Sequence, residues 1–226
     1  MIPRFPVYLF DIDGTLLDSA ADICGAVQHV LASASTPKDV PFEYLKSFIG
    51  LHLIDLFSDV YPDHSAPQID GLIQQYRTAY LARGHAQTRV YSGVSEGLAA
   101  LGGRKATATT KGSATTRAVL EQFGLIQYFD HVQGTDGFPC KPAPDVVLTA
   151  LAALGAQPED CLFGAIRQPT WKPAAARGCG PARCAMGTGR RMSWRGGRRI
   201  IGWGICGSWC DGGLDTKVRI LAVGVK

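Results

Sequence analysis

Apolar residues follow two patterns in the first 163 residues, short unbroken runs and helical spacing. Pro6–Phe10 is an apolar run that is typical of a buried parallel strand, and a polar segment follows it directly. After this run the apolar positions recur every three to four residues, with no strand pattern between them. The predicted helices cover residues 19–32, 42–48, 51–57 and 69–81. This pattern indicates a helical segment inserted after a first strand.

From residue 88 onward, strand and helix patterns alternate. Helices are predicted at 95–101, 113–123 and 144–154, and strands at 105–109, 131–134 and 161–163. Such alternation is typical of a parallel sheet with helices on both faces. We therefore predict an α/β protein whose doubly wound, Rossmann-like core comprises residues 1–16 and 88–163. The remaining parts are an all-helical cap at 17–87 and an irregular tail at 164–226.

The charge of the chain changes abruptly near residue 164. Residues 1–163 hold 11 Lys and Arg against 17 Asp and Glu, a net charge of −6. Residues 164–226 hold 12 Lys and Arg against two acids, a net charge of +10, and these values add to the net charge of +4 for the whole chain. All four Trp and four of the seven Cys also lie in the tail. The tail therefore has a composition unlike that of the preceding residues.

Length and hydropathy exclude several classes of protein. A chain of 226 residues is too long for a small disulfide scaffold, and no apolar stretch approaches the roughly 18–20 residues of a spanning helix. Asp11 interrupts the N-terminal apolar run before a secretory signal could form. We expect a soluble, cytoplasmic monomer or homodimer with reduced cysteines and no membrane partner.

Two carboxylates, Asp11 and Asp13, come directly after the first predicted strand. In an extended backbone, residues two apart point to the same side, so that both could face the carboxyl edge of the sheet. Such a pair can hold a divalent hard cation, with one carboxylate attacking a substrate and the other moving a proton. A solvated turn before a helix is the alternative for these residues alone.

Polar residues also follow two later strands of the predicted sheet. Thr109, Thr110 and Lys111 come at the end of the strand predicted at 105–109, where a hydroxyl and helix N-terminal N–H groups can hold a phosphate. An N-cap role for Thr109 is the structural alternative. Lys141 lies between prolines ahead of a helix, in a stiff loop that can present its ammonium to an anion, although an isolated Lys there is usually a surface charge.

Together these segments resemble the haloacid dehalogenase superfamily, specifically its phosphatases with a helical cap, the phosphoglycolate phosphatase-like group. The similarity covers about residues 6–163 and rests on LFDIDGTLLDS, ATTK and CKPAPD. It implies a Mg²⁺-dependent phosphatase acting on a small phosphate monoester, with 2-phosphoglycolate favoured, through an aspartyl-phosphate intermediate.

The resemblance also implies a role for each matching residue. Asp11 would be the nucleophile and Asp13 the general acid and base, and both would hold Mg²⁺, Asp13 through its backbone carbonyl. Thr109 and Lys141 would clamp the phosphate. The remaining phosphate contacts would come from Gly14, Thr15 and Thr110.

One segment of the cap resembles the substrate-facing loop of the family. It is Phe48-Ile-Gly50-Leu-His52, so that Gly50 and His52 are candidate specificity residues. A helix C-cap explains Gly50 equally well, and a surface histidine explains His52.

Two other functions remain open at this stage. A sugar phosphomutase would keep both aspartates and would move phosphate between hydroxyls rather than release it. A non-enzymatic phosphate- or nucleic-acid-binding protein would use the tail, where Arg190, Arg191, Arg195 and two neighbouring tryptophans could bind a single strand by charge and stacking. The tail cysteines lack the paired spacing and the histidines of a zinc site.

The resemblance ends where a fourth motif is expected. Phosphatases of this group carry acids after the next strand that complete the Mg²⁺ site, yet no Asp or Glu lies between Asp160 and Asp211. Residues 165–173 can be written GCG ATT CGC CAG CCG ACA TGG AAG CC, and the frame that starts at the third base encodes D-S-P-A-D-M-E-A. Later tail segments also permit family-like sequence in this frame, followed by a stop codon at Cys210. We therefore predict that the tail from about Gly164 is translated out of frame.

Sequencing the coding DNA around the codon for Phe163 tests this prediction. Loss of a single base from a Val codon that follows Phe163 would produce Phe-Gly-Ala and the start of Ile166. We expect the genomic or source DNA to contain that base and to continue in the shifted frame. An uninterrupted frame through residue 226, verified in independent clones, would disprove the frameshift.

Overall fold

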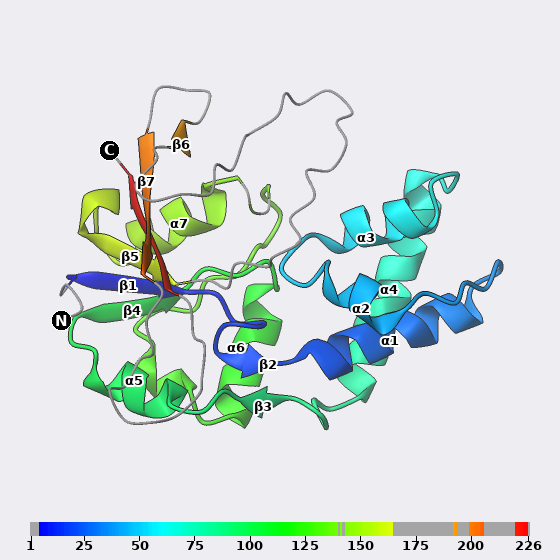
Figure 1. Cartoon of the computed structure of the whole chain (residues 1–226), viewed down its shortest axis with the longest axis horizontal. Helices are drawn as coiled ribbons and strands as arrows, with labels where there is room; N and C mark the ends of the chain where they lie inside the picture. Colours follow the sequence, from blue (N-terminus) through cyan, green and yellow to red (C-terminus); the bar gives the residue numbers. More distant parts are fainter. Residues whose placement is uncertain are drawn as a thin grey trace.

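Three parallel strands form the centre of the molecule. The computed structural model describes residues 5–139, 141 and 143–164 and, in the tail, three strands only. The central sheet has the order β4-β1-β5 and is entirely parallel. Its strands are β1 (Val7–Phe10), β4 (Arg104–Thr107) and β5 (Cys161–Gly164). The predicted α/β core with a parallel sheet is therefore confirmed (Figure 1).

Alternate residues of β1 pack on opposite faces of the sheet. Val7 and Leu9 lie in one apolar cluster with α7 (Asp145–Ala153). Tyr8 and Phe10 lie in another cluster with residues of α5 (Val94–Ala100) and α6 (Ser113–Gln122). Helices thus cover both faces, which explains why all four β1 residues are buried and why the strand is an unbroken apolar run.

One predicted strand is reduced to a single bridge. The segment at 131–134 pairs with the edge of the sheet only at Ala106 and His131. Beyond this bridge the hydroxyl of Thr107 replaces the backbone, because Thr107 Oγ1 accepts a hydrogen bond from the Gln133 N–H at 2.7 Å and donates to the Gln133 carbonyl at 2.9 Å. Apolar spacing carries no signal of this exchange, so the sequence overestimates the strand.

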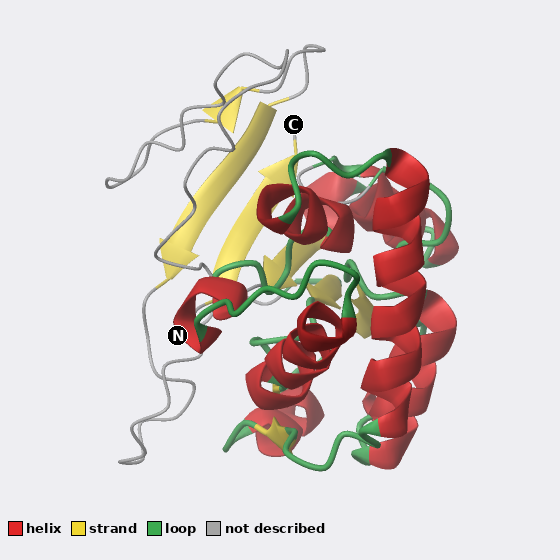
Figure 2. Ribbon diagram, turned by 90° about the vertical axis from the view of Figure 1, so that its right-hand side faces the viewer, coloured by secondary structure: helices red, strands yellow, loops and turns green. Residues whose placement is uncertain are grey.

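Four helices follow the first strand and form a layer of their own. They are α1 (Ala20–Ser33), α2 (Phe42–Lys46), α3 (Leu53–Val60) and α4 (Ala66–Ala82). Their buried side chains make a separate apolar cluster in which α1 packs on α4. Figure 2 views the molecule from this side and shows the helices standing in front of the sheet. We call this group of helices the insert.

A short antiparallel pair joins the insert to the central sheet. β2 (Leu17–Asp18) leaves the core and β3 (Arg89–Val90) returns to it, with Leu17 opposite Val90. The sequence does not predict this pair, because two residues are too few to show alternation. Two 3₁₀ turns complete the described elements of residues 5–164, η1 (Ile126–Tyr128) and η2 (Pro158–Asp160).

Asp22 fastens the start of the insert to its end. One carboxylate oxygen accepts hydrogen bonds from the Thr88 hydroxyl at 2.8 Å and the Gln87 N–H at 2.9 Å, and the other pairs with Arg83 Nε at 3.3 Å. The side chain is fully buried, and burial by itself would raise the pKa of Asp22. The hydrogen bonds outweigh burial and hold this pKa below its ordinary value.

Three strands are described in the tail. They are β6 (Met192–Ser193), β7 (Arg199–Ile205) and β8 (Ile220–Val225), which form an antiparallel sheet in that order. These residues are extended, whereas the sequence predicts an irregular tail, and the runs of Ile and Val in β7 and β8 explain the difference. The segment that follows Gly164, where the frame is predicted to change, lies outside the described residues.

Replacing Asp22 by Asn tests whether its hydrogen bonds stabilise the junction between the start and the end of the insert. Because the pKa of Asp22 is lowered in the folded state, its contribution is present above the unfolded pKa near about 4 and is lost as the pH falls through the folded value. We expect Asp22→Asn to lower the free energy of unfolding by about 1–3 kcal/mol at pH 7, and the difference from the parent to shrink below about pH 4. Denaturant unfolding at several pH values measures this.

Asp70→Asn is the matched control, because Asp70 lies on α4 with an exposed side chain. Its effect should stay within about 0.5 kcal/mol at every pH. A loss of stability by Asp22→Asn that did not change with pH would contradict the assignment.

Candidate active site

A tight turn follows β1 and places two aspartates at the carboxyl end of the sheet. Asp11 continues the sheet, since its N–H donates to the Gly164 carbonyl at 2.9 Å. The chain then turns at Gly14, whose φ of 73° is a left-handed conformation that glycine adopts without strain. The Ile12 carbonyl accepts hydrogen bonds from three successive N–H groups, which holds the turn closed.

Asp11 is paired with Lys141. Lys141 Nζ lies 2.7 Å from Asp11 Oδ2, and both side chains are largely buried. The other carboxylate oxygen of Asp11 accepts a hydrogen bond from the Ile12 N–H at 2.9 Å. The carbonyl of Ala108, beyond the end of β4, is a further acceptor for Lys141 at 3.4 Å. Lys141 therefore bridges the loops that follow two neighbouring strands.

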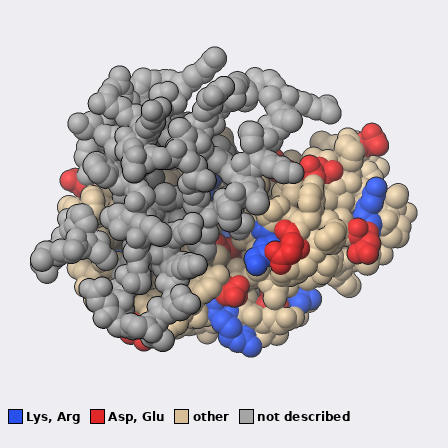
Figure 3. Space-filling view, in the orientation of Figure 1, with Lys and Arg blue, Asp and Glu red and all other residues tan. Residues whose placement is uncertain are grey.

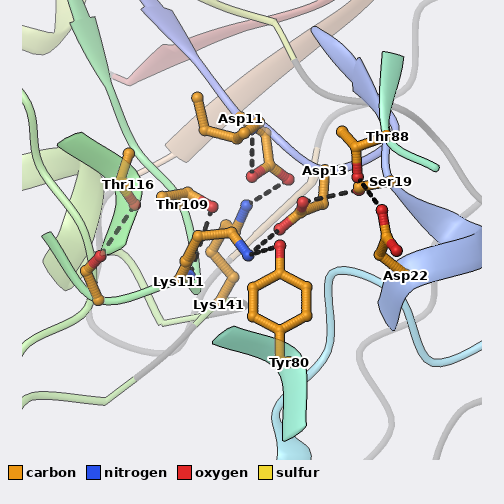
Figure 4. A network of polar contacts seen from close by, with 12 residues as sticks. Asp11, Asp13, Ser19, Asp22, Tyr80, Thr88, Thr109, Lys111, Thr116 and Lys141 are labelled. Carbon is orange, nitrogen blue, oxygen red and sulfur yellow. Dashed lines mark hydrogen bonds and ion pairs between the residues drawn. The ribbon is translucent and has the colours of Figure 1, made fainter. Parts of the chain in front are cut away.

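Asp13 is paired with a second lysine, Lys111. Lys111 Nζ lies 3.3 Å from Asp13 Oδ2, and Ser19 donates to Asp13 Oδ1 at 2.7 Å. Lys111 also donates to the hydroxyl of Tyr80 on α4 at 2.9 Å. Figure 4 shows the two carboxylates and the two ammonium groups converging on one point between the core and the insert.

The loop after β4 holds Lys111 in place. The Ala108 N–H continues the sheet by donating to the Phe10 carbonyl at 2.8 Å, and Thr109, which is fully buried, accepts a hydrogen bond from the Lys111 N–H at 3.4 Å. Gly134 lies directly under this loop, where a Cβ would stand 2.2 Å from the Lys111 carbonyl oxygen. Only glycine allows the two segments to approach so closely.

Lys111 stays positively charged although it is buried. Burial by itself would lower the pKa of Lys111, because an ammonium group loses its hydration. The carboxylate of Asp13 and the oxygen of Tyr80 outweigh burial and raise this pKa above its ordinary value. The site therefore holds two aspartates and two lysines in the described part, and each aspartate faces one lysine.

The structure brings most of the residues named from the sequence to one place. Asp11 pairs with Lys141, and Asp13 lies beside them at the same end of the sheet. Gly14 and Thr15 form the turn between the aspartates and the insert, and Thr109 and Thr110 lie in the loop that carries Lys111. Thr15 is buried, and Thr110 is half-buried. The sequence does not single out Tyr80 or Ser19, and it gives Lys111 no role of its own beyond its place after Thr110. A lysine directly after two threonines at a strand end is the one signal that could have indicated Lys111.

Gly50 and His52 lie apart from this group, between α2 and α3. Gly50 has a φ of 89°, and His52 is the N-cap of α3, where its ring nitrogen accepts a hydrogen bond from the Ile54 N–H at 3.4 Å. Among the described residues, no hydrogen bond or ion pair joins either of them to the two aspartates. Their role in specificity stays a prediction.

The positive charge beside the two aspartates comes from Lys111 and Lys141. On the face drawn in Figure 3, the acidic and basic side chains of the described residues lie in small separate groups. The described part of the chain contains no helix that is long and apolar enough to cross a bilayer.

The comparisons with known proteins agree with this geometry. Residues 8–163 match the family of haloacid dehalogenase-like hydrolases. The chain belongs to this family. The matched residues include both aspartates, both lysines and the whole insert, and they end at β5.

Several known proteins are similar in sequence to this chain. A phosphoglycolate phosphatase of Nitrosospira multiformis is 34% identical over 164 residues, which are 69% of this chain and 72% of the relative. The tyrosine-protein kinase PtkA of Mycobacterium tuberculosis is 34% identical over 194 residues, 80% of this chain but only 62% of the relative. The chain thus spans less than two thirds of that kinase.

A solved haloacid dehalogenase-like structure supports the same fold. A protein described as a predicted phosphatase from Clostridium acetobutylicum superposes with a TM-score of 0.65 at 29% identity. The superposition covers 71% of this chain and 76% of that structure. The sheet, its flanking helices and the insert therefore belong to a known arrangement.

Replacing Gly134 by Ala tests how the loop that carries Lys111 is supported. The added Cβ would overlap backbone atoms of Lys111 and Gly112, which cannot rotate away. We expect Gly134→Ala to lower the free energy of unfolding by about 1–3 kcal/mol. Gly71→Ala is the control, because Gly71 lies within α4 with open space around it and should gain about 0.5–1 kcal/mol. Equal effects of the two substitutions, measured by denaturant unfolding, would contradict the close approach.

Proposed function

We propose that this protein is a Mg²⁺-dependent phosphatase that hydrolyses a small phosphate monoester, 2-phosphoglycolate in particular, through an aspartyl-phosphate. The observation that carries the proposal is the pairing of Asp11 with Lys141 and of Asp13 with Lys111 at the end of β1. Membership of the haloacid dehalogenase-like family supports it, as do relatives named phosphoglycolate phosphatase in three further organisms, Caulobacter vibrioides, Aquifex aeolicus and Pseudomonas aeruginosa.

In the first step Asp11 attacks phosphorus. Its carboxylate is held by Lys141 and by the Ile12 N–H, so that the oxygen is fixed at the end of the strand. Lys141 also offsets the charge of the phosphate dianion, which otherwise repels a carboxylate. The phosphorus–oxygen bond to the alcohol breaks as Asp13 gives its proton to the departing oxygen, and the phosphoryl group stays on Asp11.

In the second step water hydrolyses the aspartyl-phosphate. Asp13 takes a proton from the attacking water, which restores the protonated acid for the next cycle, and inorganic phosphate leaves Asp11. Ser19 and Lys111 hold the two oxygens of Asp13 from opposite sides, so that the carboxyl group keeps one orientation through both steps. Thr109 and the N–H groups of its loop are placed to hold the phosphate.

Magnesium fits the donors that the described residues offer. Mg²⁺ is bound through one or two carboxylates together with substrate phosphate, and the Asp11 carboxylate and the Asp13 carbonyl are such hard oxygen donors. The described part contains no group of three or more metal-binding side chains, and the segment after Gly164, where the fourth motif is expected, lies outside that part. When bound, Mg²⁺ would neutralise charge on the transferring phosphoryl group.

The insert acts as a cap in this proposal. Tyr80 of α4 contacts Lys111 of the core, so that the helical layer reaches the aspartates directly. A cap closed over bound substrate would exclude water that competes for the phosphoryl group during the first step. We propose residues 17–87 as the cap and residues 1–16 and 88–163 as the catalytic core.

Phosphate release in the presence of Mg²⁺ tests the proposal. The full chain and a version with the shifted-frame C-terminus would be incubated with 2-phosphoglycolate, a hexose phosphate and inorganic controls. We expect hydrolysis of 2-phosphoglycolate by the restored version, a rate at least about 100-fold lower for the chain as written, and loss of activity on removal of Mg²⁺. Asp11→Asn should abolish release in both.

Two other outcomes would overturn the proposal. Transfer of phosphate between the hydroxyls of a sugar without release would indicate a phosphomutase. Phosphorylation of a tyrosine peptide from ATP, the activity that the name of the mycobacterial relative describes, would indicate a kinase.

Asp55→Asn is the matched control for Asp11→Asn, because Asp55 lies exposed on α3, and it should leave phosphate release unchanged.

A further inference from the structure

Lys111 is a second buried cation, and it is placed differently from Lys141. Lys141 pairs with the nucleophile Asp11, where the phosphate of a substrate must lie. Lys111 pairs instead with Asp13, which meets the oxygen of the departing alcohol. The two ammonium groups thus face the two aspartates, which in the proposed function act at the two ends of a phosphate ester.

The insert holds Lys111 firmly through Tyr80. The Tyr80 hydroxyl accepts a hydrogen bond from Lys111 Nζ at 2.9 Å, and the same ammonium lies 4.3 Å from the centre of the Tyr80 ring. The ring of Tyr80 stacks on Tyr76 at 5.7 Å and meets the ring of His85 edge to face at 4.9 Å. A lysine side chain normally samples many rotamers, and these contacts restrict it to one position beside Asp13.

The position of Lys111 allows it to pair with an acidic group on the leaving alcohol of the phosphate ester. The leaving oxygen lies against Asp13, so that a group one methylene further along the alcohol comes within reach of an ammonium 3.3 Å from Asp13. A buried ammonium is costly without anionic partners, and a carboxylate would supply a second one. A neutral hydroxyl of a sugar would leave the charge of Lys111 with Asp13 alone.

We propose that Lys111 is a specificity-determining residue that binds a carboxylate on the leaving alcohol of the substrate, and that Tyr80 positions it. The substrate class is therefore the phosphate esters of short 2-hydroxy acids. This inference rests on the proposed phosphatase function and narrows it, because it excludes sugar phosphates as preferred substrates. It assigns selectivity to a contact between the core and the insert.

Two ligands that differ only in the charged group test the proposal. The probes are 2-phosphoglycolate and 2-hydroxyethyl phosphate, which has a neutral hydroxymethyl group in place of the carboxylate. Titration calorimetry with the full chain carrying Asp11→Asn and with Mg²⁺ present prevents turnover, so that binding alone is measured. We expect 2-phosphoglycolate to bind about 100-fold more tightly than 2-hydroxyethyl phosphate.

Adding Lys111→Met to this chain should bring the ratio of the two dissociation constants close to one. The ratio is the decisive quantity, because an unpaired Asp13 carboxylate would weaken the binding of both ligands through the phosphate group that they share. Lys46→Met is the matched control, since Lys46 is exposed on α2, and it should keep the ratio. A ratio near one in the parent, or an unchanged ratio in Lys111→Met, would overturn the proposal.

A second pair of variants decides the matter if Lys111→Met does not fold. Tyr80→Phe keeps the ring but removes the hydroxyl that contacts Lys111, and it should reduce the ratio about tenfold. Tyr76→Phe removes the neighbouring hydroxyl, for which the structure shows no hydrogen bond to Lys111, and it should leave the ratio intact. Equal ratios for the two variants would count against a positioning role for Tyr80.

The failure of this inference differs from failure of the phosphatase function. Phosphate release from both probes at equal efficiency would leave a phosphatase without the carboxylate subsite. Selective binding of 2-phosphoglycolate without phosphate release would keep the subsite and remove the proposed reaction.

Discussion

Two aspartates that follow the same buried strand would repel each other without the lysines that face them. Lys111 lies in the loop after β4 and Lys141 in the loop before α7, and each pairs with one carboxylate. Their positions require the parallel sheet, because only the carboxyl ends of neighbouring strands bring these loops together. The turn at Gly14, the close approach at Gly134 and the contact with Tyr80 all serve to hold these four charges at short distances.

The pairing also explains why the helical insert and the core depend on each other. Asp22 fastens the insert at its base, while Tyr80 contacts Lys111 at the aspartates. Movement of α4 therefore changes the surroundings of Lys111 directly, and through it those of Asp13. In the proposed function, this connection lets the binding of the alcohol end of the substrate favour the arrangement that transfers its phosphate.

The sequence predicts much of the fold and three of the four charged residues of the site, all but Lys111. The apolar run of β1 and the helical spacing of α1 and α4 appear in the sequence because burial imposes a regular period. The pair of β2 and β3 is too short for any period, and beyond the bridge at His131 the hydroxyl of Thr107 replaces the backbone pairing. Lys111 and Tyr80 are 31 residues apart in sequence, so that only the packing of α4 on the core reveals their contact.

The central claim is that Asp11 carries the phosphoryl group, and trapping that group tests it most directly. The chain with the shifted-frame C-terminus would be mixed with 2-phosphoglycolate and Mg²⁺, quenched in acid within one turnover, and digested for mass spectrometry. The account predicts an acid-stable phosphoryl group on the peptide that contains Asp11, and none after Asp11→Asn. Rapid phosphate release without any phosphorylated intermediate, or a phosphoryl group on another residue, would contradict the account.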